Sequence, residues 1–443
     1  MRSFDAPVPA LGPRYPPRPL PGTVRSEALA ATARRRPPIS QTNDIDTTKD
    51  MKSSFTLLAA ASVIGLAGTA AAAPQVTLYV DAAAPAGQSG LMNWNNALDS
   101  LQDALDQATA NSSAANEYTI LVREGTYRPD PQPLGTARSF LIDQTANVRV
   151  VGAFINSGNP DAPDGNIRRC ILDGSAYIDP VAGPQDAATH VVEVLGLGAV
   201  PTAMVTVSNL SVTGGRAVGA ALGFPDEFNG AGVFCLSNAT VEFNDLFIYS
   251  NYAGTPVGNV GTDGRGGGMY LANQGQGQQR GKRCFFTLNG ADEGGAMAID
   301  TGQGFFVGGC TFARNGFVQS FGMPLDAPET VGGGALYLGA QTSSNFSNSL
   351  FYDNAARVYG GAILWEPFGA NNPQTPRTHI FTNCTLSENI VRGERVQVST
   401  DPLVFDFIAQ DARDAGVHIL AGGQANGRKG MVFRNSILWN QTD

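Results

Sequence analysis

Charged side chains that could bind a cation or a sugar gather in the segment 390–414. The acidic members are Glu394, Asp401, Asp406, Asp411 and Asp414, and the basic members are Arg392, Arg395 and Arg413. Carboxylate oxygens suit Ca²⁺, and charged or polar groups can orient a bound ligand by hydrogen bonds. This segment is the best place in the sequence for glycan or Ca²⁺ contacts, but mixed charge on a long loop ordinarily serves solubility, and we favour that interpretation.

Two acidic groups elsewhere offer acid–base chemistry. Arg168 and Arg169 lie near Asp161, Asp164 and Asp173 in sequence, where carboxylates and a base could meet. The alternative is a polar loop before the strand Cys170-Ile171-Leu172, and we favour that loop. The pair Asp292-Glu293 falls in a short turn, where adjacent acids usually point to solvent.

The remaining chemical motifs are weak. Gly264-Arg265-Gly266-Gly267-Gly268 could cradle a phosphate, but neither a helix nor Lys-Ser/Thr follows, so turn formation is the better interpretation. The three histidines, His190, His379 and His418, are scattered, and His418 is expected to be a packed or surface imidazole. The sequence therefore predicts no catalytic, cofactor-binding or metal-binding residue, with Ca²⁺ left open.

The amino-acid composition and charge of the chain limit the classes of protein to which it could belong. The chain has 443 residues, 53 of them Gly, and only 15% are charged. Outside the first 52 residues, 20 basic side chains face 33 acidic ones, so this surface repels nucleic acid. The five cysteines, Cys170, Cys235, Cys284, Cys310 and Cys384, form no C-x-x-C motif. For the last three, which share one repeat position, core filling is favoured over disulfides.

The N-terminus reads as an export signal preceded by an extension. Residues 1–50 are rich in Pro and Arg and are expected to be disordered or mis-assigned, with translation starting at Met51. Residues 51–72 have a cationic start, an apolar run and small residues before a cut near Ala72, as secretory signals do. No transmembrane helix is expected in the mature chain, which would be secreted or held at the cell surface.

The elements that follow are a cap and then a repeat. Residues 73–130 are expected to cap a solenoid, with a strand at 75–81 and an amphipathic helix over 94–108 covering the first coil. Residues 131–443 carry repeats that pair Phe-x-x-Asn with a Gly-rich strand opening. The copies begin at Ile248, Phe286, Phe312, Phe351, Leu386 and Ile437.

Spacing within the repeat points to stacked parallel strands. The arc from each Gly-rich opening to the next Phe is nearly constant apart from an insertion at 367–376, whereas the arc after each Asn ranges from 7 to 27 residues. A solenoid behaves in this way, because strands stay in register while insertions collect at one corner. The Phe should stack inward between coils, and the Asn should end the strand by adopting left-handed geometry and form ladders. The fold class expected is all-β, a right-handed parallel β-helix.

These motifs carry a family resemblance. Gly-Gly-Ala-[Ile/Leu/Met] with Phe-x-x-Asn resembles the repeat of polymorphic outer membrane proteins, within the right-handed parallel β-helix (pectin lyase-like) superfamily. The resemblance implies a cell-surface or outer-membrane protein, and the superfamily also includes polysaccharide lyases and polygalacturonases. The polygalacturonase marks Asn-Thr-Asp, Asp-Asp, Gly-His-Gly and Arg-Ile-Lys do not occur. The chain stops within a repeat, so its C-terminus is expected to be uncapped or truncated.

We therefore expect an exported, non-catalytic surface or adhesion protein that binds a glycan or protein partner. The expected contacts are the loops 252–266, 316–331 and 390–414, which should meet along one edge, facing a plain wall of strands. The alternative is a polysaccharide lyase or glycoside hydrolase with a divergent site. A cleft where two carboxylates and a basic residue converge would favour that enzyme.

Overall fold

The computed structural model describes fifteen segments of the chain. They are 75–111, 116–131, 138–143, 147–179, 183–196, 203–218, 228–254, 264–273, 277–316, 332–366, 377–391, 394–397, 405–408, 417–419 and 429–439. All lie in one compact unit, Thr69–Asp443. The predicted extension 1–50 and signal 51–72 lie outside the described residues.

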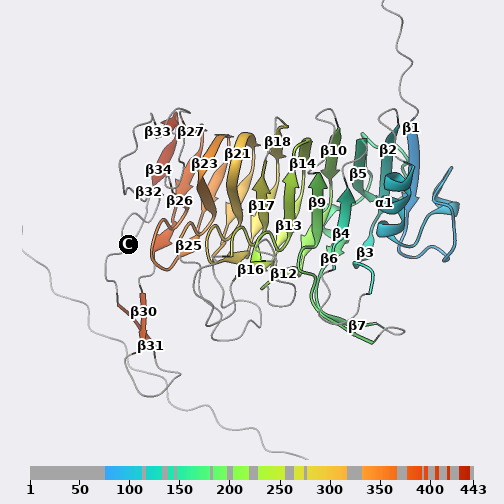
Figure 1. Cartoon of the computed structure of the whole chain (residues 1–443), viewed down its shortest axis with the longest axis horizontal. Coiled ribbons are helices and arrows are strands. Elements are labelled where there is room, and N and C mark those ends of the chain that lie inside the picture. The colour runs from blue at the N-terminus through green and yellow to red at the C-terminus, as the bar shows by residue number, and fades with distance from the viewer. Residues whose placement is uncertain are drawn as a thin grey trace, which may run out of the picture. The chain divides into compact units, whose positions relative to one another are not determined.

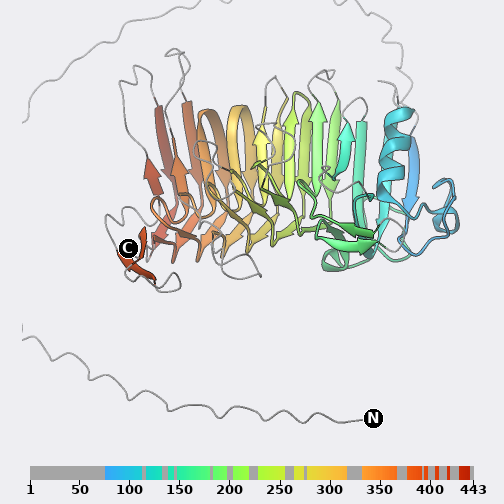
Figure 2. The ribbon, with the colours of Figure 1, turned by 60° about the horizontal axis from the view of Figure 1, so that its bottom comes forward.

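The unit is a right-handed parallel β-helix whose coils present three faces (Figures 1 and 2). Face 1 contains β4 (Phe140–Asp143), β9 (Val192–Gly196), β13 (Val233–Ser237), β17 (Met269–Ala272), β26 (Ile363–Trp365) and β32 (Val417–Ile419). Face 2 contains β1 (Gln75–Val80), β2 (Glu117–Arg123), β5 (Asn147–Phe154), β10 (Met204–Ser208), β14 (Thr240–Asn244), β18 (Gln279–Lys282), β27 (Arg377–Thr382) and β33 (Lys429–Arg434). β21 (Met297–Gly308) and β23 (Leu336–Ser347) run from face 1 into face 2 and join them into one sheet.

Face 3 is a separate sheet of short strands. It contains β3 (Gly125–Tyr127), β6 (Cys170–Asp173), β11 (Ser211–Thr213), β15 (Phe247–Tyr249), β19 (Phe285–Thr287), β22 (Thr311–Ala313), β24 (Leu350–Tyr352), β28 (Thr385–Ser387) and β34 (Ile437–Trp439). Each strand pairs in parallel with its equivalent in the next coil, which is the arrangement predicted from the repeat.

Short strands occupy the corner between faces 3 and 1. They are β12 (Arg216–Ala217), β16 (Tyr252–Ala253) and β20 (Gly290–Ala291) in one ladder, and β25 (Ala355–Ala356) and β29 (Ile390–Val391) in another. Two antiparallel hairpins complete the strands, β7 (Tyr177–Asp179) with β8 (Gly183–Gln185) and β30 (Glu394–Gln397) with β31 (Phe405–Ile408). Within the described part, no helix has the length and apolar character needed to cross a bilayer.

The inward Phe stack is confirmed. Phe286, Phe312, Phe351 and Leu386 pair in register, and the aromatic rings stack with centroids 4.8 and 4.7 Å apart. All four are fully buried, so each contributes about 2 kcal/mol of apolar burial. The last predicted copy is wrong by one residue, because Leu438 and not Ile437 pairs with Leu386.

The turn after each face 3 strand differs from the prediction in one respect. The left-handed conformation falls on the residue before the Asn, as at Leu288 (φ 58°) and Arg314 (φ 58°), and not on Asn289 or Asn315 themselves. The Asn is thereby free to point inward, where its side chain bonds its neighbours in the ladder. A side chain that pointed out of the turn could not do so.

The N-terminal helix is shorter than predicted. A 3₁₀ turn at Trp94–Asn96 precedes α1 (Leu101–Ala110), whose N-cap Ser100 accepts a hydrogen bond from the Asp103 amide. The helix does not begin at residue 94 because the backbone of Leu98 bonds instead to Tyr79 and Asp81 of the β1 strand region. The apolar face of α1 packs against β1, β2 and β4, as expected for a cap (Figure 2).

Candidate functional site

A hollow opens on the corner between faces 2 and 3, where the sequence predicted a plain wall. At this corner the chain turns through one left-handed residue per coil, including Asn209 (φ 56°), Asp245 (φ 53°) and Arg283 (φ 53°). Asn and Asp adopt this conformation more readily than most residues. Because the turn recurs at the same place in successive coils, its side chains are neighbours, as Asp245 and Arg283 are at 2.6 Å.

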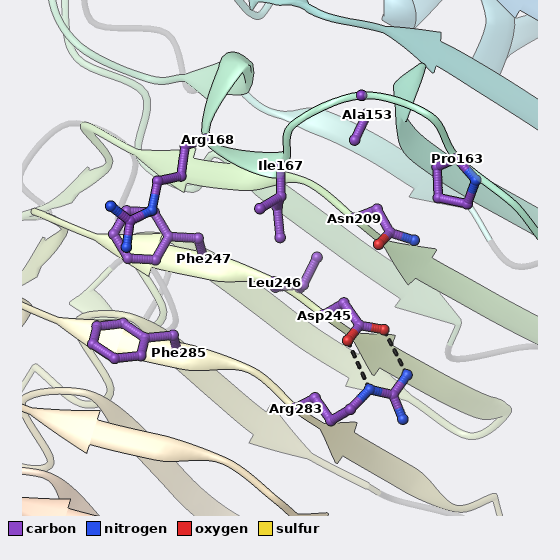
Figure 3. Close-up of a pocket in the computed structure, with 11 residues that line it drawn as sticks. Ala153, Pro163, Ile167, Arg168, Asn209, Asp245, Leu246, Phe247, Arg283 and Phe285 are labelled. Atoms are coloured by element: carbon purple, nitrogen blue, oxygen red, sulfur yellow. Dashed lines mark hydrogen bonds and ion pairs between the residues drawn. The ribbon is translucent and has the colours of Figure 1, made fainter. Parts of the chain in front are cut away.

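We call this hollow the wall groove, and its volume is about 430 Å³ (Figure 3). Its lining is Ala153, Pro163, Gly165, Ile167, Arg168, Asn209, Asp245, Leu246, Phe247, Arg283 and Phe285. The size falls within the range of small-molecule sites, and the lining mixes apolar surface with a few polar groups.

Aromatic rings and one guanidinium dominate the mouth of the wall groove. Phe247 and Phe285 lie in register on neighbouring coils with ring centroids 5.5 Å apart, and Phe285 keeps 36% of its surface exposed. The Arg168 guanidinium lies 4.9 Å from the centre of the Phe247 ring. A 3₁₀ turn, Ile167–Arg169, holds it there, since its N-cap Asn166 accepts a hydrogen bond from the Arg168 amide at 2.9 Å.

The charges of the wall groove are unevenly matched. Arg283 donates to both carboxylate oxygens of Asp245, at 2.7 and 2.6 Å, so these two charges neutralise each other. Arg168 forms no ion pair with a described carboxylate. The groove therefore offers free guanidinium donors beside exposed aromatic rings, which suits binding. It supplies one carboxylate, whereas two are needed for hydrolysis of a glycosidic bond.

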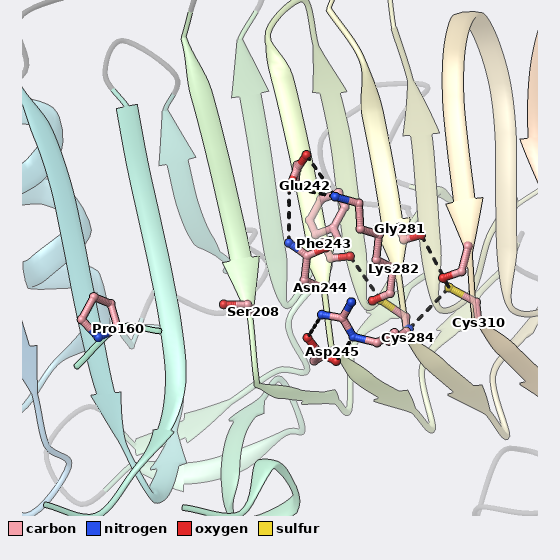
Figure 4. Close-up of polar contacts among 12 residues, drawn as sticks. Pro160, Ser208, Glu242, Phe243, Asn244, Asp245, Gly281, Lys282, Cys284 and Cys310 are labelled. Atoms are coloured by element: carbon pink, nitrogen blue, oxygen red, sulfur yellow. Dashed lines mark hydrogen bonds and ion pairs between the residues drawn. The ribbon is translucent and has the colours of Figure 1, made fainter. Parts of the chain in front are cut away.

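A second hollow of about 530 Å³ lies on face 2. It is lined by Glu117, Asn147, Val148, Arg149, Met204, Thr206, Glu242 and Asn244. Figure 4 shows Glu242 beside Lys282, and Arg280 also bonds its carboxylate at 2.9 Å. Burial acts to raise the pKa of Glu242, but Lys282, Asn244 and Arg280 outweigh it and lower the pKa below its ordinary value. Glu242 is thus held as a carboxylate, which is the wrong state for a general acid.

The structure joins two motifs that the sequence treated separately. Arg265, from the Gly-rich turn, donates to Glu293 at 2.8 Å and to Asp300 at 3.1 Å. Its guanidinium lies over the ring of Tyr337, 4.5 Å from the centre. Burial opposes the charge on Arg265, but Tyr337, Glu293 and Asp300 outweigh it and raise the pKa above the ordinary value.

The prediction that Asp292 and Glu293 face solvent is therefore wrong. They are 4% and 7% exposed, and Asp292 accepts a hydrogen bond from the Gly264 amide at 3.0 Å. Their short turn lies against the neighbouring Gly-rich turn, where Gly266 has φ 66° and too little space for a Cβ atom. Two carboxylates and a basic residue do converge here, but the two carboxylates are those of Glu293 and Asp300, and both are bonded to Arg265 itself.

The acids near Arg168 and Arg169 do not form a cluster. Asp161 pairs with Arg149 at 2.6 Å, and Asp173 pairs with Arg128 at 2.8 Å. Asp164 accepts backbone hydrogen bonds from Ile155, Asn156 and Ser157, which hold its pKa below the ordinary value. The described residues contain no group of three or more His, Cys, Asp or Glu side chains placed to hold a metal ion.

The predicted binding loops are described only in part. Segments 255–263, 317–331, 398–404 and 409–416 lie outside the described residues, as do the side chains of 392–416. The described bases of these loops lie at one corner, since β16 and β29 belong to the ladders between faces 3 and 1.

His418 lies in β32, in register with Leu364 of β26. Sequence reasoning missed the wall groove because its residues come from separate coils.

Comparison with known proteins gives likenesses of fold. No protein-family model matches the chain, and neither does any curated protein. One similar solved structure is the pectate lyase Pel9A, with 15% identity, 73% of each chain covered and a TM-score of 0.41. Another is Escherichia coli ybhc, with 14% identity, 82% of this chain and 84% of that chain covered and a TM-score of 0.40. A third is the pectin methylesterase from Aspergillus niger, with 13% identity, coverage of 83% and 86% and a TM-score of 0.31.

Proposed function

We propose that the protein is exported and binds an extended polysaccharide across face 3 without cleaving it. The observation that carries this proposal is the unpaired Arg168 guanidinium lying over Phe247, beside the exposed Phe285. Aromatic faces pack against the C–H faces of sugar rings, and guanidinium N–H groups donate to sugar hydroxyls or carboxylates. This combination supports a sugar as the ligand.

The repeat supports a polymer as the ligand. Outward positions of face 3 recur about 4.8 Å apart along the axis, so a long chain can meet several coils in succession. The wall groove lies at one edge of face 3, and the loops 252–266, 316–331 and 390–414 leave from the other edge. In this proposal the groove anchors one sugar, and the loops hold the polymer farther along.

Binding without cleavage is supported by the state of the acids in the two hollows and beside Arg265. The carboxylate in the wall groove is neutralised by Arg283, and Glu293 and Asp300 share Arg265. Glu242, on face 2, has a lowered pKa and cannot donate a proton near neutral pH. The alternative, a glycoside hydrolase, would need an acid of raised pKa facing a second free carboxylate, and the described residues that line the two hollows do not supply that pair.

Binding of the full chain to a glycan array, followed by a reducing-end assay on every bound polymer, tests the proposal. Acidic and neutral polymers should both be included, because guanidinium donors suit either. We expect binding with no new reducing ends. Arg168→Ala and Phe285→Ala should each weaken binding about tenfold, consistent with about 1–2 kcal/mol for a cation–π or stacking contact.

Two matched variants act as controls. Arg169→Ala removes the neighbouring guanidinium, which pairs with Glu124 at 3.8 Å, and Phe306→Ala removes an exposed ring from face 2. Both should bind like the wild type. Equal binding by all four variants would remove the wall groove from the proposal, and release of reducing ends would replace binding with catalysis.

A further inference from the structure

One column of small polar residues runs inside the corner between faces 2 and 3. It contains the residues two positions before the inward stack, Cys284, Cys310, Ser349, Cys384 and Ser436. Three backbone amides in the column donate to the side chain one coil further on: that of Cys284 to the Cys310 Sγ at 3.4 Å, that of Cys310 to the Ser349 Oγ at 3.3 Å and that of Cys384 to the Ser436 Oγ at 3.2 Å. All five residues are therefore in register.

Cys284 and Cys310 are neighbours in this column, 26 residues apart in sequence (Figure 4). The next residues, Phe285 and Thr311, are paired between β19 and β22, and the Thr311 amide donates to the Cys284 carbonyl at 2.9 Å. In-register neighbours of a parallel sheet lie about 4.8 Å apart, which is inside the Cα separation of about 4.4–6.8 Å that disulfides require.

The other cysteines have no such neighbour. Ser349 separates Cys310 from Cys384 in the column, and Ser436 follows Cys384. Cys235 lies on face 1, in register with Val194 and Leu271. Cys170 is the residue before Ile171 in β6, where the next coil carries Leu210 before Ser211. All five side chains are thiols in the structure, and all are buried.

The two adjacent thiols, Cys284 and Cys310, differ in the direction of their pKa shifts. A hydrogen bond from Cys284 lowers the pKa of Cys310, and backbone amides including that of Cys284 lower it further. The same hydrogen bond, together with burial, raises the pKa of Cys284 well above its ordinary value. Cys310 is accordingly the better nucleophile, because thiolates and not thiols attack disulfides.

We propose that Cys284 and Cys310 are an oxidisable pair that closes a disulfide between two successive coils. The oxidant is a small disulfide such as oxidised glutathione. The Cys310 thiolate attacks one of its sulfurs, forming a mixed disulfide and releasing one glutathione thiolate. Cys284 then loses its proton and attacks the Cys310 sulfur, which forms the protein disulfide and releases the second glutathione. Two protein thiols are oxidised, and one glutathione disulfide is reduced to two thiols.

Thiol counting on the full chain tests this inference. The protein is incubated natively with oxidised glutathione and, in parallel, refolded from urea in the same buffer, because buried thiols meet an oxidant most readily while folding. Both samples are then unfolded with an alkylating agent and mapped by mass spectrometry. We expect three alkylated cysteines, Cys170, Cys235 and Cys384, and one peptide pair joined through Cys284 and Cys310.

Two cysteine variants test whether the disulfide joins Cys284 and Cys310 and not another pair. Cys284→Ser should leave all four remaining cysteines alkylated, whereas Cys235→Ser should keep the linked pair and lose one free thiol. Five alkylated cysteines in both the native and the refolded samples would overturn the proposal. A linkage through any other cysteine, or glutathione retained on Cys310, would overturn it equally.

Discussion

The side-chain nitrogen of Asn289 donates a hydrogen bond to the side-chain oxygen of Asn315 in the next coil, over 3.1 Å. The same bond repeats from Asn251 to Asn289, from Asn315 to Asn354 and from Asn354 to Asn389. The side-chain oxygen of each following Asn also accepts a hydrogen bond from the backbone amide of the ladder Asn in the preceding coil. Because these amides are buried, the ladder satisfies polar groups that would otherwise lose their water.

Asn315→Ala should destabilise the protein by about 2–4 kcal/mol, because it leaves buried partners on both sides without hydrogen bonds. Denaturant melts followed by circular dichroism measure the loss. Asn345→Ala is the matched control, since Asn345 is exposed on face 2 and should change stability by less than about 0.5 kcal/mol. Equal losses for the two variants would show that the ladder adds no particular stability.

Phe312→Ala should cost about 3–5 kcal/mol, because it opens a cavity between two rings stacked 4.8 and 4.7 Å away. Phe306→Ala removes the same side chain from a site that is 38% exposed and should cost much less. The measurement is again the denaturant midpoint at constant slope. A Phe312→Ala loss no larger than that of Phe306→Ala would contradict the inward stack.

Glu242→Gln should destabilise the protein mainly above pH 4.5. The pKa of Glu242 in the folded protein lies below its ordinary value of 4.5, so its pairs with Arg280 and Lys282 stabilise the fold above that pH. The contribution disappears as the pH falls through the folded-state pKa. Unfolding free energies of wild type and variant, measured from about pH 7 to pH 3, should therefore converge at the acidic end. A difference that stays constant with pH would contradict this assignment.

The exported form should begin near Ala73. Residues 51–72 have the three-part layout of a secretory signal, and their removal leaves the first strand, β1, at the new N-terminus. N-terminal sequencing of protein recovered outside the cell checks this. A mature chain that still contains residues 13–21 would show that the signal interpretation is wrong.

Deleting residues 392–412 should weaken polysaccharide binding while the β-sheet signal in the far-ultraviolet spectrum stays unchanged. Loop length costs little stability, and the described hairpin β30–β31 pairs with itself and not with the three faces. Binding and circular dichroism are measured on the same preparation. Unchanged affinity would mean that the corner only tolerates insertions.

The sequence was sufficient for the parts of the fold that depend on local repetition. Phe286, Phe312 and Phe351 each stand three residues before an Asn, and in-register stacking follows from that constant spacing alone. The prediction of one constant and one variable arc likewise placed the loop bases at a single corner. The sequence-based prediction was wrong where a tertiary contact uses backbone groups that the helix would otherwise use. The Leu98 amide bonds to the Tyr79 carbonyl, so the helix is shorter than predicted.

What the sequence could not decide was which side chains from different coils meet. Arg168 reaches Phe247 across 79 positions, and Arg265 reaches Asp300 across 35 positions, and no local spacing encodes either contact. Acidity of Asp292 and Glu293 suggested exposure, but packing of successive Gly-rich turns buried them. The repeat period and the residue types at each repeat position determine how the coils stack, because the same local pattern recurs in every coil. Only the tertiary structure determines which side chains meet on the surface. Each groove is lined by residues from different coils, and the register between the coils sets which of them are neighbours.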